Sequence, residues 1–428
     1  MKENGTMRKS KMEPPVRQAN NRVTRRQFLK GSMGTAAALT IVPRHVLGGA
    51  RRTPPSETVG AALIGCGGRG PGTFDDLNSQ HRLNVTMLAQ CDVRFRDRAD
   101  NKTIYTDFRR VLERKDIEVV AIATPPHWHA LISIAAMEAG KDVLCEKPMT
   151  RFIAEGRAVV EAQRRYKRIF QIGTYGRFGA SQSRANIETH KIMESGLLKP
   201  CKAVYINRGG FKVKEWSGKV NLRPEPVPSN LDWDMYVGPS PMKPYHHHRT
   251  GGTHRCYWDY EGGGLADMGQ HFFDPFQWIY AKDDTSPVEI EAYAPPAHPE
   301  ACGMWGWVEM KYADGFTLVL DSGEWGQPYS RQEPRGVSMG DLDEKSRRSV
   351  ASMPDPDPLV GFGEAVKTRK RPGGHAEAAH RCATLLHLAN IAIRTGRKIR
   401  YDPVKEQIIG DEEANRLVNQ PMRVPWHL

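Results

Sequence analysis

This sequence of 428 residues has no run of about 18 consecutive apolar residues, which excludes a protein that crosses a membrane several times. It has no internal repeat of about 20–50 residues, which argues against solenoids and propellers. Hydrophobic residues make up 39% of the chain and charged residues 26%, a balance typical of a globular protein. The length therefore predicts two or three domains and a sizeable core.

Cysteine is scarce, and its pattern excludes two further classes. The seven cysteines are odd in number and include no Cys-x-x-Cys pair, which argues against a disulfide framework and a zinc ribbon. The run His246, His247 and His248, with His254 nearby, could coordinate a metal, but such runs are more often polar loops. We therefore expect no metal site.

The positive charge is concentrated near the N-terminus. The net charge is +13, but residues 1–50 hold ten of the 62 Lys and Arg and only two of the 49 Asp and Glu. The rest of the chain has a mild basic excess without the basic stripe that nucleic-acid-binding proteins carry. We therefore expect no nucleic-acid partner.

Residues 1–50 have the layout of a twin-arginine export signal. Arg25 and Arg26 precede a modest apolar segment over 33–42, and small residues end the segment at Ala50. No cysteine follows the apolar segment, so we expect no stable membrane anchor. The alternative is a basic tail beside a short buried helix. The sequence thus predicts a signal peptide over 1–50, a linker over 51–58, the twin-arginine export machinery as a partner, and a periplasmic or otherwise exported location.

A G-x-G-x-x-G pattern occupies residues 65–70, after a predicted strand over 59–64 and before a predicted helix over 71–78. In a dinucleotide-binding fold the first glycine allows a tight turn, the second lets a pyrophosphate approach the backbone, and the third lets the helix pack on the strand. The free N–H groups of the helix N-terminus then face the phosphates. The cofactor-binding residues predicted in this turn are Gly65, Gly67, Gly68, Arg69 and Gly70.

A second predicted strand over 85–90 leads to Asp92, which lies 22 residues beyond Gly70. A carboxylate at this distance can bind a ribose 2′-OH and repels a 2′-phosphate, so we predict NAD in preference to NADP. Arg94 and Arg96 nearby weaken this preference. The alternative is a glycine turn in an unrelated α/β sheet.

Strands and helices continue to alternate, which predicts a parallel, doubly wound sheet. The carboxyl ends of such strands meet at one crevice, so Gly65, Asp92, Thr124 and Lys147 should converge there. The further strands are predicted over 118–123, 142–145 and 168–172, and the helices over 127–139 and 151–167.

The chain resembles the Gfo/Idh/MocA oxidoreductases over residues 58–428. The resemblance rests on the motifs GCGGRG, ATPPHWHA, CEKPM and GTYGRF, and on a G-G-G run followed by D-x-G-x-H, which ends at His271. The run from Arg381 to Asp402 also resembles a subgroup of exported bacterial members. The family resemblance implies an α/β protein with a Rossmann domain over 59–176 and an α+β domain over 177–428, the second with a large open, mostly antiparallel sheet. It also implies a homo-oligomer.

The resemblance implies functional residues at the matching positions. The catalytic residues would be Lys147, Asp267 and His271. The segment beside the cofactor would contribute Thr124, Pro125, His129 and Glu146. The segment beside the substrate would contribute Thr174, Tyr175 and Arg177.

These residue types suit the oxidation of a secondary alcohol. Asp267 and His271 are four residues apart on a predicted helix and share a face, so the carboxylate can orient His271 as a general base. Lys147 can stabilise a developing alkoxide. The roles of Asp267 and His271 can be exchanged, and both can instead form a surface pair or, with Asp274, bind a metal. Trp258 and Tyr260 are expected to stack on a sugar.

The sequence thus predicts an NAD-dependent oxidoreductase that acts on a secondary hydroxyl of a sugar, glycoside or cyclitol. Because the export route carries folded proteins and free NAD is scarce outside the cytoplasm, we expect a tightly bound cofactor that is recycled in the site. One alternative is glycoside cleavage by transient oxidation and elimination. Another is a non-catalytic, dinucleotide-bound carbohydrate-binding protein.

The rest of the chain is predicted to supply the second sheet and its cover. Trp305 and Trp307 share one strand face, which we expect to be covered by helices or by a second subunit. Residues 323–360 read as a long loop, and 375–394 as a packing helix. The strands are expected over 202–208, 288–294, 303–312 and 316–320.

Overall fold

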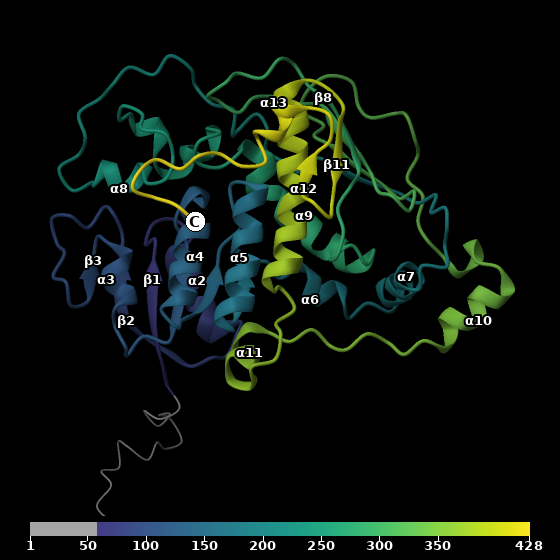
Figure 1. Ribbon diagram of the computed structural model, residues 1–428, viewed down its shortest axis with the longest axis horizontal. Helices are drawn as coiled ribbons and strands as arrows, with labels where there is room; N and C mark the ends of the chain where they lie inside the picture. The colour runs from purple at the N-terminus through teal and green to yellow at the C-terminus, as the bar shows by residue number, and fades with distance from the viewer. Residues whose placement is uncertain (1–57) are drawn as a thin grey trace, which may run out of the picture. The chain divides into compact units, whose positions relative to one another are not determined.

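The computed structural model describes residues 58–428, so the predicted export signal and all of the linker except Thr58 lie outside the described residues. The first sheet has six parallel strands in the order β3-β2-β1-β4-β5-β6 (Figure 1). This is the predicted doubly wound arrangement. The strands are β1 (Val59–Ile64), β2 (Val85–Cys91), β3 (Ile104–Tyr105), β4 (Val119–Ile122), β5 (Asp142–Cys145) and β6 (Phe170–Ile172).

Helices cover both faces of this sheet because its central strands are apolar on both sides. Every residue of β4 and β5 is buried. The connection from β2 to β3 has no helix in the described structure, as its short length predicts. The helices of this part are α2 (Gly70–Ser79), α3 (Phe108–Leu112), α4 (His129–Glu138) after the 3-10 turn η2 (Pro126–Trp128), and α5 (Ile153–Tyr166).

The second sheet is mixed and mostly antiparallel, as predicted. Its order is β12-β11-β8-β9-β10-β7, and only β7 and β10 pair in parallel. The last two strands of this sheet were not predicted from the sequence. The strands are β7 (Val204–Arg208), β8 (Glu289–Tyr293), β9 (Trp307–Lys311), β10 (Thr317–Asp321), β11 (Ile399–Asp402) and β12 (Gln407–Ile408).

Two long helices, α9 (Gly263–Ile279) and α12 (Ala376–Thr395), pack on one face of the second sheet. Figure 1 shows α12 standing between this sheet and α5 of the first part. Val308 and Met310 of β9 join the core under α12, whereas Trp307 faces the other side. Trp305 precedes β9 and joins the core under α12, so the two tryptophans do not share one strand face as predicted. Tyr329 from the segment after β10 covers Trp307, so within this chain a loop covers it rather than a helix.

The segment over 323–360 differs from the predicted long loop because it contains α10 (Glu344–Ser352). Asp343 caps this helix by accepting the N–H of Ser346, and Val350 packs against Ile192 of α7. No helix among residues 58–428 combines the length and hydropathy needed to cross a bilayer. The remaining helices are α6 (Gly176–Ala180), α7 (Arg184–Glu194), α8 (Trp233–Val237), α11 (Phe362–Thr368) and α13 (Glu412–Asn415), and the remaining 3-10 turns are η3 (His247–Arg249), η4 (Gly251–Cys256) and η5 (Met339–Asp341).

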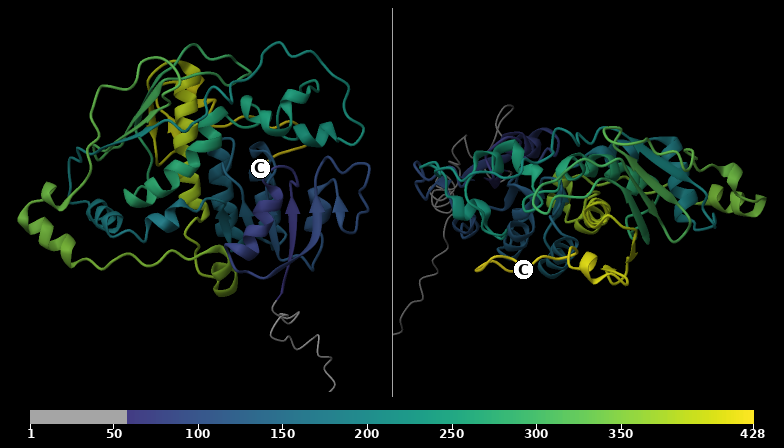
Figure 2. Two further views of the ribbon diagram at one scale, coloured as in Figure 1. Left: turned by 180° about the vertical axis from the view of Figure 1, so that it is seen from behind. Right: turned by 90° about the horizontal axis from the view of Figure 1, so that it is seen from above.

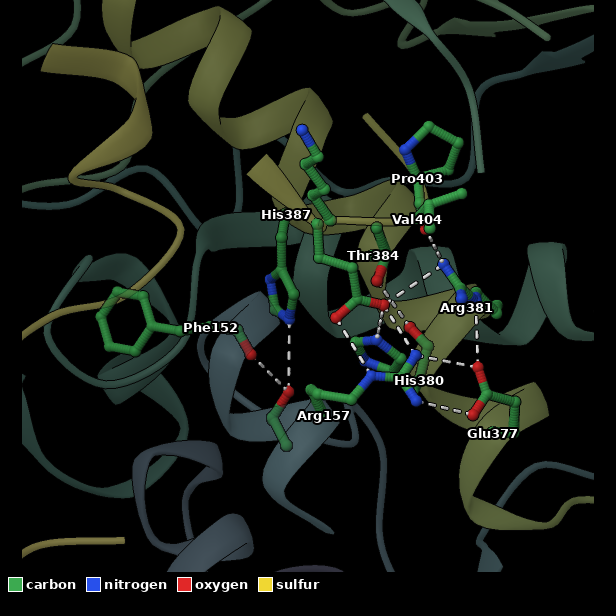
Figure 3. A network of polar contacts seen from close by, with 12 residues as sticks. Phe152, Arg157, Glu377, His380, Arg381, Thr384, His387, Pro403 and Val404 are labelled. Atoms are coloured by element: carbon green, nitrogen blue, oxygen red, sulfur yellow. Dashed lines mark hydrogen bonds and ion pairs between the residues drawn. The ribbon is translucent and has the colours of Figure 1, made fainter. Parts of the chain in front are cut away.

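An ionic network joins the two parts where α5 meets α12 (Figure 3). Arg157 of α5 donates to Glu377 of α12 at 2.8 Å and to Glu406, in the turn between β11 and β12, at 2.7 Å. Glu406 also accepts a hydrogen bond from His380, whose ring packs against Gly156 of α5. The network ties the second sheet to a helix of the first.

Candidate active site

A cleft of about 550 Å³ opens at the carboxyl ends of the first sheet. Parallel α/β sheets bind ligands at this edge, and the volume lies within the range of ligand pockets. One side of the cleft comes from the segments after β1, β2, β4 and β5, and the other from α8 and η4. Met235 and Tyr236 of α8 thus line the same cleft as the glycine turn.

The glycine turn is packed on one side and bare on the other. A Cβ atom on Gly65, which has a φ of +89°, would lie 2.5 Å from the backbone of Ala123, and one on Gly70 would lie 2.2 Å from the carbonyl oxygen of Gly65. A Cβ on Gly67 or Gly68 would have no atom within 4 Å. Both of these glycines line the cleft, so a ligand can approach their backbone closely.

The surrounding groups fit a dinucleotide. The Thr124 hydroxyl is buried at the cleft and has no hydrogen-bond partner among the described residues, so a ligand can satisfy it. The Asp92 carboxylate follows β2 and accepts the N–H groups of Cys66 at 2.8 Å and Arg94 at 2.9 Å. These bonds hold the carboxylate at the cleft with lone pairs to spare for ribose hydroxyls.

Glu146 and Arg69 connect the end of β5 to the glycine turn. The Glu146 carboxylate accepts hydrogen bonds from Arg69 Nε at 3.0 Å and from the Thr73 hydroxyl of α2 at 2.7 Å. Both charged side chains line the cleft, together with Pro125. Their mutual pairing keeps the turn and the next residue, Lys147, in a fixed relation.

Lys147 lies at the junction of the two parts of the molecule. Its ammonium group donates to the Asp267 carboxylate at 2.8 Å and to the Asp267 carbonyl oxygen at 2.6 Å, and both side chains are nearly buried. Asp267 belongs to α9, whose N-terminal turn lies close to the backbone of Phe211. Only glycine fits at position 264, because a Cβ there would overlap the carbonyl oxygen of Phe211. The glycine run before Asp267 therefore serves the packing of this helix.

Asp267 bridges two cations. The same carboxylate oxygen lies 2.8 Å from Arg255 Nε, and Arg255 lines the cleft. Burial raises the pKa of Asp267, but the positive charges of Lys147 and Arg255 outweigh this and lower the pKa to about 2. Asp267 is therefore ionised throughout the physiological range.

His271 lies one turn further along α9, where its imidazole is exposed at the cleft. It has no hydrogen-bond partner among the described residues, so Asp267 does not orient it as predicted from their spacing. The shared face exists, but the carboxylate turns to Lys147 and Arg255 instead. Desolvation lowers the pKa of His271, and the charge of Lys147 lowers it further against the opposing effect of Glu146. The imidazole is therefore neutral at neutral pH and can accept a proton.

Most predicted site residues line this cleft, but several do not. Tyr175 reaches it and also donates to Asp76. His129 is buried behind the cleft between the carbonyl oxygens of Thr124 and Pro148, so it joins two strand ends without facing a ligand.

Thr174, predicted beside the substrate, is 1% exposed and does not line the cleft, and three further predicted substrate residues are in the core. The Arg177 guanidinium is buried and pairs with Asp274 at 2.7 Å and Asp283 at 2.9 Å, so it fastens α6 to α9. Trp258 donates its indole N–H to the carbonyl oxygen of His298, and Tyr260 packs in a buried aromatic cluster. None of the three is among the cleft-lining residues.

Two charged residues of the cleft, Arg255 and Glu261, were not predicted from the sequence, and His254 was considered there only with the histidine run. Arg255 and His254 belong to η4, and Glu261 precedes the glycine run. Glu261 lies 3.0 Å from His254 Nε2 and 3.8 Å from Arg255 Nε, so polar contacts extend from Lys147 to His254. The only sequence signal was their proximity to the G-G-G run, which does not specify the contacts.

Comparison with known proteins accounts for both parts of the chain. A family model described as "Oxidoreductase family, NAD-binding Rossmann fold" matches residues 59–174, and one described as "Oxidoreductase family, C-terminal alpha/beta domain" matches residues 184–428. Both are models of the same family, and the second alone spans more than half of the chain. The protein is a member of the Gfo/Idh/MocA family.

Several Gfo/Idh/MocA relatives align with parts of this chain. A levoglucosan dehydrogenase from Pseudarthrobacter phenanthrenivorans is 51% identical over 57 residues, 13% of this chain and 15% of that protein. An inositol 2-dehydrogenase from Salmonella typhimurium is 33% identical over 120 residues, 26% of this chain and 34% of that protein. The chain thus spans about a third or less of these curated relatives.

Comparison with solved structures shows a further likeness in fold. The WlbA dehydrogenase from Bordetella pertussis, solved with NADH and UDP-GlcNAcA, superimposes with a TM-score of 0.51 at 15% sequence identity. The match covers 81% of this chain and 99% of that one. It shows a shared two-part fold.

Proposed function

We propose that this protein is an NAD-dependent oxidoreductase that transfers a hydride between nicotinamide and a secondary hydroxyl of a sugar, glycoside or cyclitol. The observation that carries the proposal is convergence. Lys147 from the end of β5 pairs with Asp267 of α9, and Lys147 and His271 line the same cleft as the bare glycine turn. The family membership supports the same reaction class.

Each side chain has a distinct role in this proposal. A bound nicotinamide supplies the hydride acceptor for the carbon that bears the hydroxyl. Neutral His271 takes the hydroxyl proton as general base, and the product is a carbonyl. The Lys147 ammonium stabilises the alkoxide as it develops. Asp267 is too acidic to serve as the base, which favours His271 over the exchanged roles.

The charge balance supports a neutral, hydroxyl-rich substrate. Lys147 and Arg255 are matched by Asp267 and Glu261, so this part of the cleft has no uncompensated charge to attract an anion. The paired groups still offer hydrogen-bond donors and acceptors. The names of the levoglucosan and inositol relatives point to the same substrate class.

We propose NAD in preference to NADP, and a cofactor that is held tightly and recycled. Asp92 at the cleft repels a 2′-phosphate, although Arg94 also lines the cleft. Tight retention is supported by Met235 and Tyr236 of α8, which line the cleft and add contact surface for a bound dinucleotide.

Three proposals rest mainly on the sequence. The division at 176/177 fits between the two family matches, which end at 174 and begin at 184. Export by the twin-arginine route rests on residues 1–50, and homo-oligomerisation on the family resemblance. Cell fractionation after mutation of Arg25 and Arg26 to Lys, and light scattering of the purified protein, test the last two.

The function is tested by mass spectrometry of the small molecules that the denatured protein releases, followed by a screen of sugars, glycosides and cyclitols. We expect released NAD, and reduction of NAD with at least one substrate. His271→Ala and Lys147→Met should lower kcat by about 10²–10⁴-fold. His247→Ala, at an exposed histidine outside the cleft lining, is the control.

Failure to bind any dinucleotide would overturn the proposal, as would full activity of the His271→Ala variant. Release of an unsaturated sugar and a free leaving group, without net NAD reduction, would replace it by cleavage through elimination.

A further inference from the structure

The segment over 416–428 returns from the second sheet to the first part of the molecule. In Figures 1 and 2 this last yellow stretch leaves α13, passes α8 and ends beside α4. Met422 and Trp426 pack against the core of the first sheet. The segment contacts both walls of the cleft through residues that do not themselves line it, as the contacts of Trp426 and Arg423 show.

Trp426 supports one wall of the cleft. Its ring meets the Trp128 ring edge-on at 4.7 Å and lies 6.3 Å from the Phe108 ring. Trp128 and Phe108 both line the cleft on their other side. The Trp426 indole N–H has no hydrogen-bond partner among the described residues, so ring contacts hold the side chain in place.

Arg423 supports the opposite wall. Its guanidinium donates to the carbonyl oxygen of Gly238 at 2.9 Å and to the Asp234 carboxylate at 2.7 Å. These two residues flank the cleft-lining pair of α8, Met235 and Tyr236. One short segment therefore fixes α8 on one side and the aromatic wall on the other.

The two walls also contact each other at this point. The Trp128 indole N–H donates to the carbonyl oxygen of Met235 at 3.0 Å. A Cβ atom on Gly238 would lie 2.2 Å from the Trp128 ring, so the backbone at the end of α8 rests directly on the indole. A shift of Trp128 would therefore move α8 as well.

We propose that Trp426 is a positioning residue for the bound dinucleotide: by holding Trp128 against α8, it keeps the cleft narrow and slows cofactor release. The inference rests on the proposed function, because it requires a dinucleotide in this cleft. It goes beyond that function by assigning cofactor retention to a side chain that lines no part of the cleft itself.

The test is the rate of NADH release from the full chain, measured by stopped-flow fluorescence with excess NAD as the competitor. Trp426→Ala should raise the dissociation rate about ten-fold or more. Trp426→Phe should restore most of the retention because a ring still reaches Trp128. Val424→Ala, at an 84% exposed position of the same segment, should leave the rate unchanged.

Arg423→Gln provides a second route if Trp426→Ala does not fold, and it should also speed release. The inference is overturned if Trp426→Ala or, where that variant does not fold, Arg423→Gln releases NADH at the wild-type rate. It is also overturned if Val424→Ala accelerates release equally. Wild-type protein that binds no dinucleotide would instead refute the proposed function, so the two failures are distinguishable.

Discussion

The network around Arg157 predicts a pH-dependent link between the two parts of the molecule (Figure 3). Burial raises the pKa of the Glu406 carboxyl, but hydrogen bonds from His380 and Arg157 outweigh this effect and lower the pKa to about 2. Burial likewise raises the pKa of the Glu377 carboxyl, but hydrogen bonds from Arg157 lower it to about 2. Burial lowers the pKa of His380, so the neutral ring donates its N–H to Glu406. Arg157 and Arg381 each pair with both carboxylates, and Arg157 makes the shorter contacts.

We expect Arg157→Met to lower the free energy of unfolding by about 2 kcal/mol at pH 7. A pKa lowered from 4.5 to about 2 corresponds to about 3 kcal/mol for one carboxyl. Other cations, Arg381 among them, supply part of this stabilisation of the ionised carboxyl. The Arg157 side chain is also 24% exposed, so solvent screening reduces the stability lost when Arg157 is replaced.

The pH dependence has a definite sign. Because the folded state lowers the pKa of both carboxyls, their contribution is complete above the ordinary value of 4.5 and is lost as the pH falls toward about 2. The difference between wild type and Arg157→Met should therefore shrink through this window, as protonated carboxyls gain little from the guanidinium.

Urea unfolding between pH 7 and pH 3.5 measures the difference. Arg164→Met is the matched control, because Arg164 lies on the same helix and also pairs with Glu377 but is 68% exposed. It should cost less than about 0.5 kcal/mol. Equal effects of the two substitutions, or a difference independent of pH, would refute the reasoning.

Two further predictions concern the cleft. Gly65→Ala should lower Tm because its Cβ would strike the backbone of Ala123. Gly67→Ala should keep Tm but weaken NADH binding at least ten-fold, because its Cβ would enter open space at the cleft. Thermal melting followed by fluorescence measures Tm, and fluorescence titration measures NADH binding. The acid limb of kcat/KM for oxidation should lie below pH 6.5, because desolvation and the charge of Lys147 lower the pKa of His271. Lys147→Arg keeps the positive charge and should keep this limb. Lys147→Met removes the charge and should move the limb to higher pH.

The first sheet could be predicted closely because its signals are local. The apolar run over 59–64 and the glycine turn after it need no knowledge of distant residues, and the observed β1 has the predicted bounds. Convergence of Asp92, Thr124 and Lys147 followed from topology alone, because parallel strands end at one edge. The alternation of strands and helices was therefore sufficient to locate the cleft.

Partners in the site could not be predicted, because contacts across the fold decide them. The four-residue spacing placed Asp267 and His271 on one face, but it could not show that Lys147 and Arg255 bind the carboxylate. Aromatic composition likewise could not distinguish a sugar platform from a core residue, so Trp258 was assigned to the substrate although it is buried.

The position of Asp267 explains why this site depends on contacts far from it. Its carboxylate joins a lysine at the end of β5 to an arginine of η4, so it holds two cations from different parts of the chain in one place. The geometry persists only if α9 keeps its position relative to the first sheet. Arg157 supports that position from outside the reaction centre, because it ties α5 of the first part to α12, which packs against α9. Trp426 acts elsewhere at the same cleft, where it contacts Trp128, the residue that bonds to α8. Substitution at either position should therefore disturb alignment at the cleft before it unfolds either sheet.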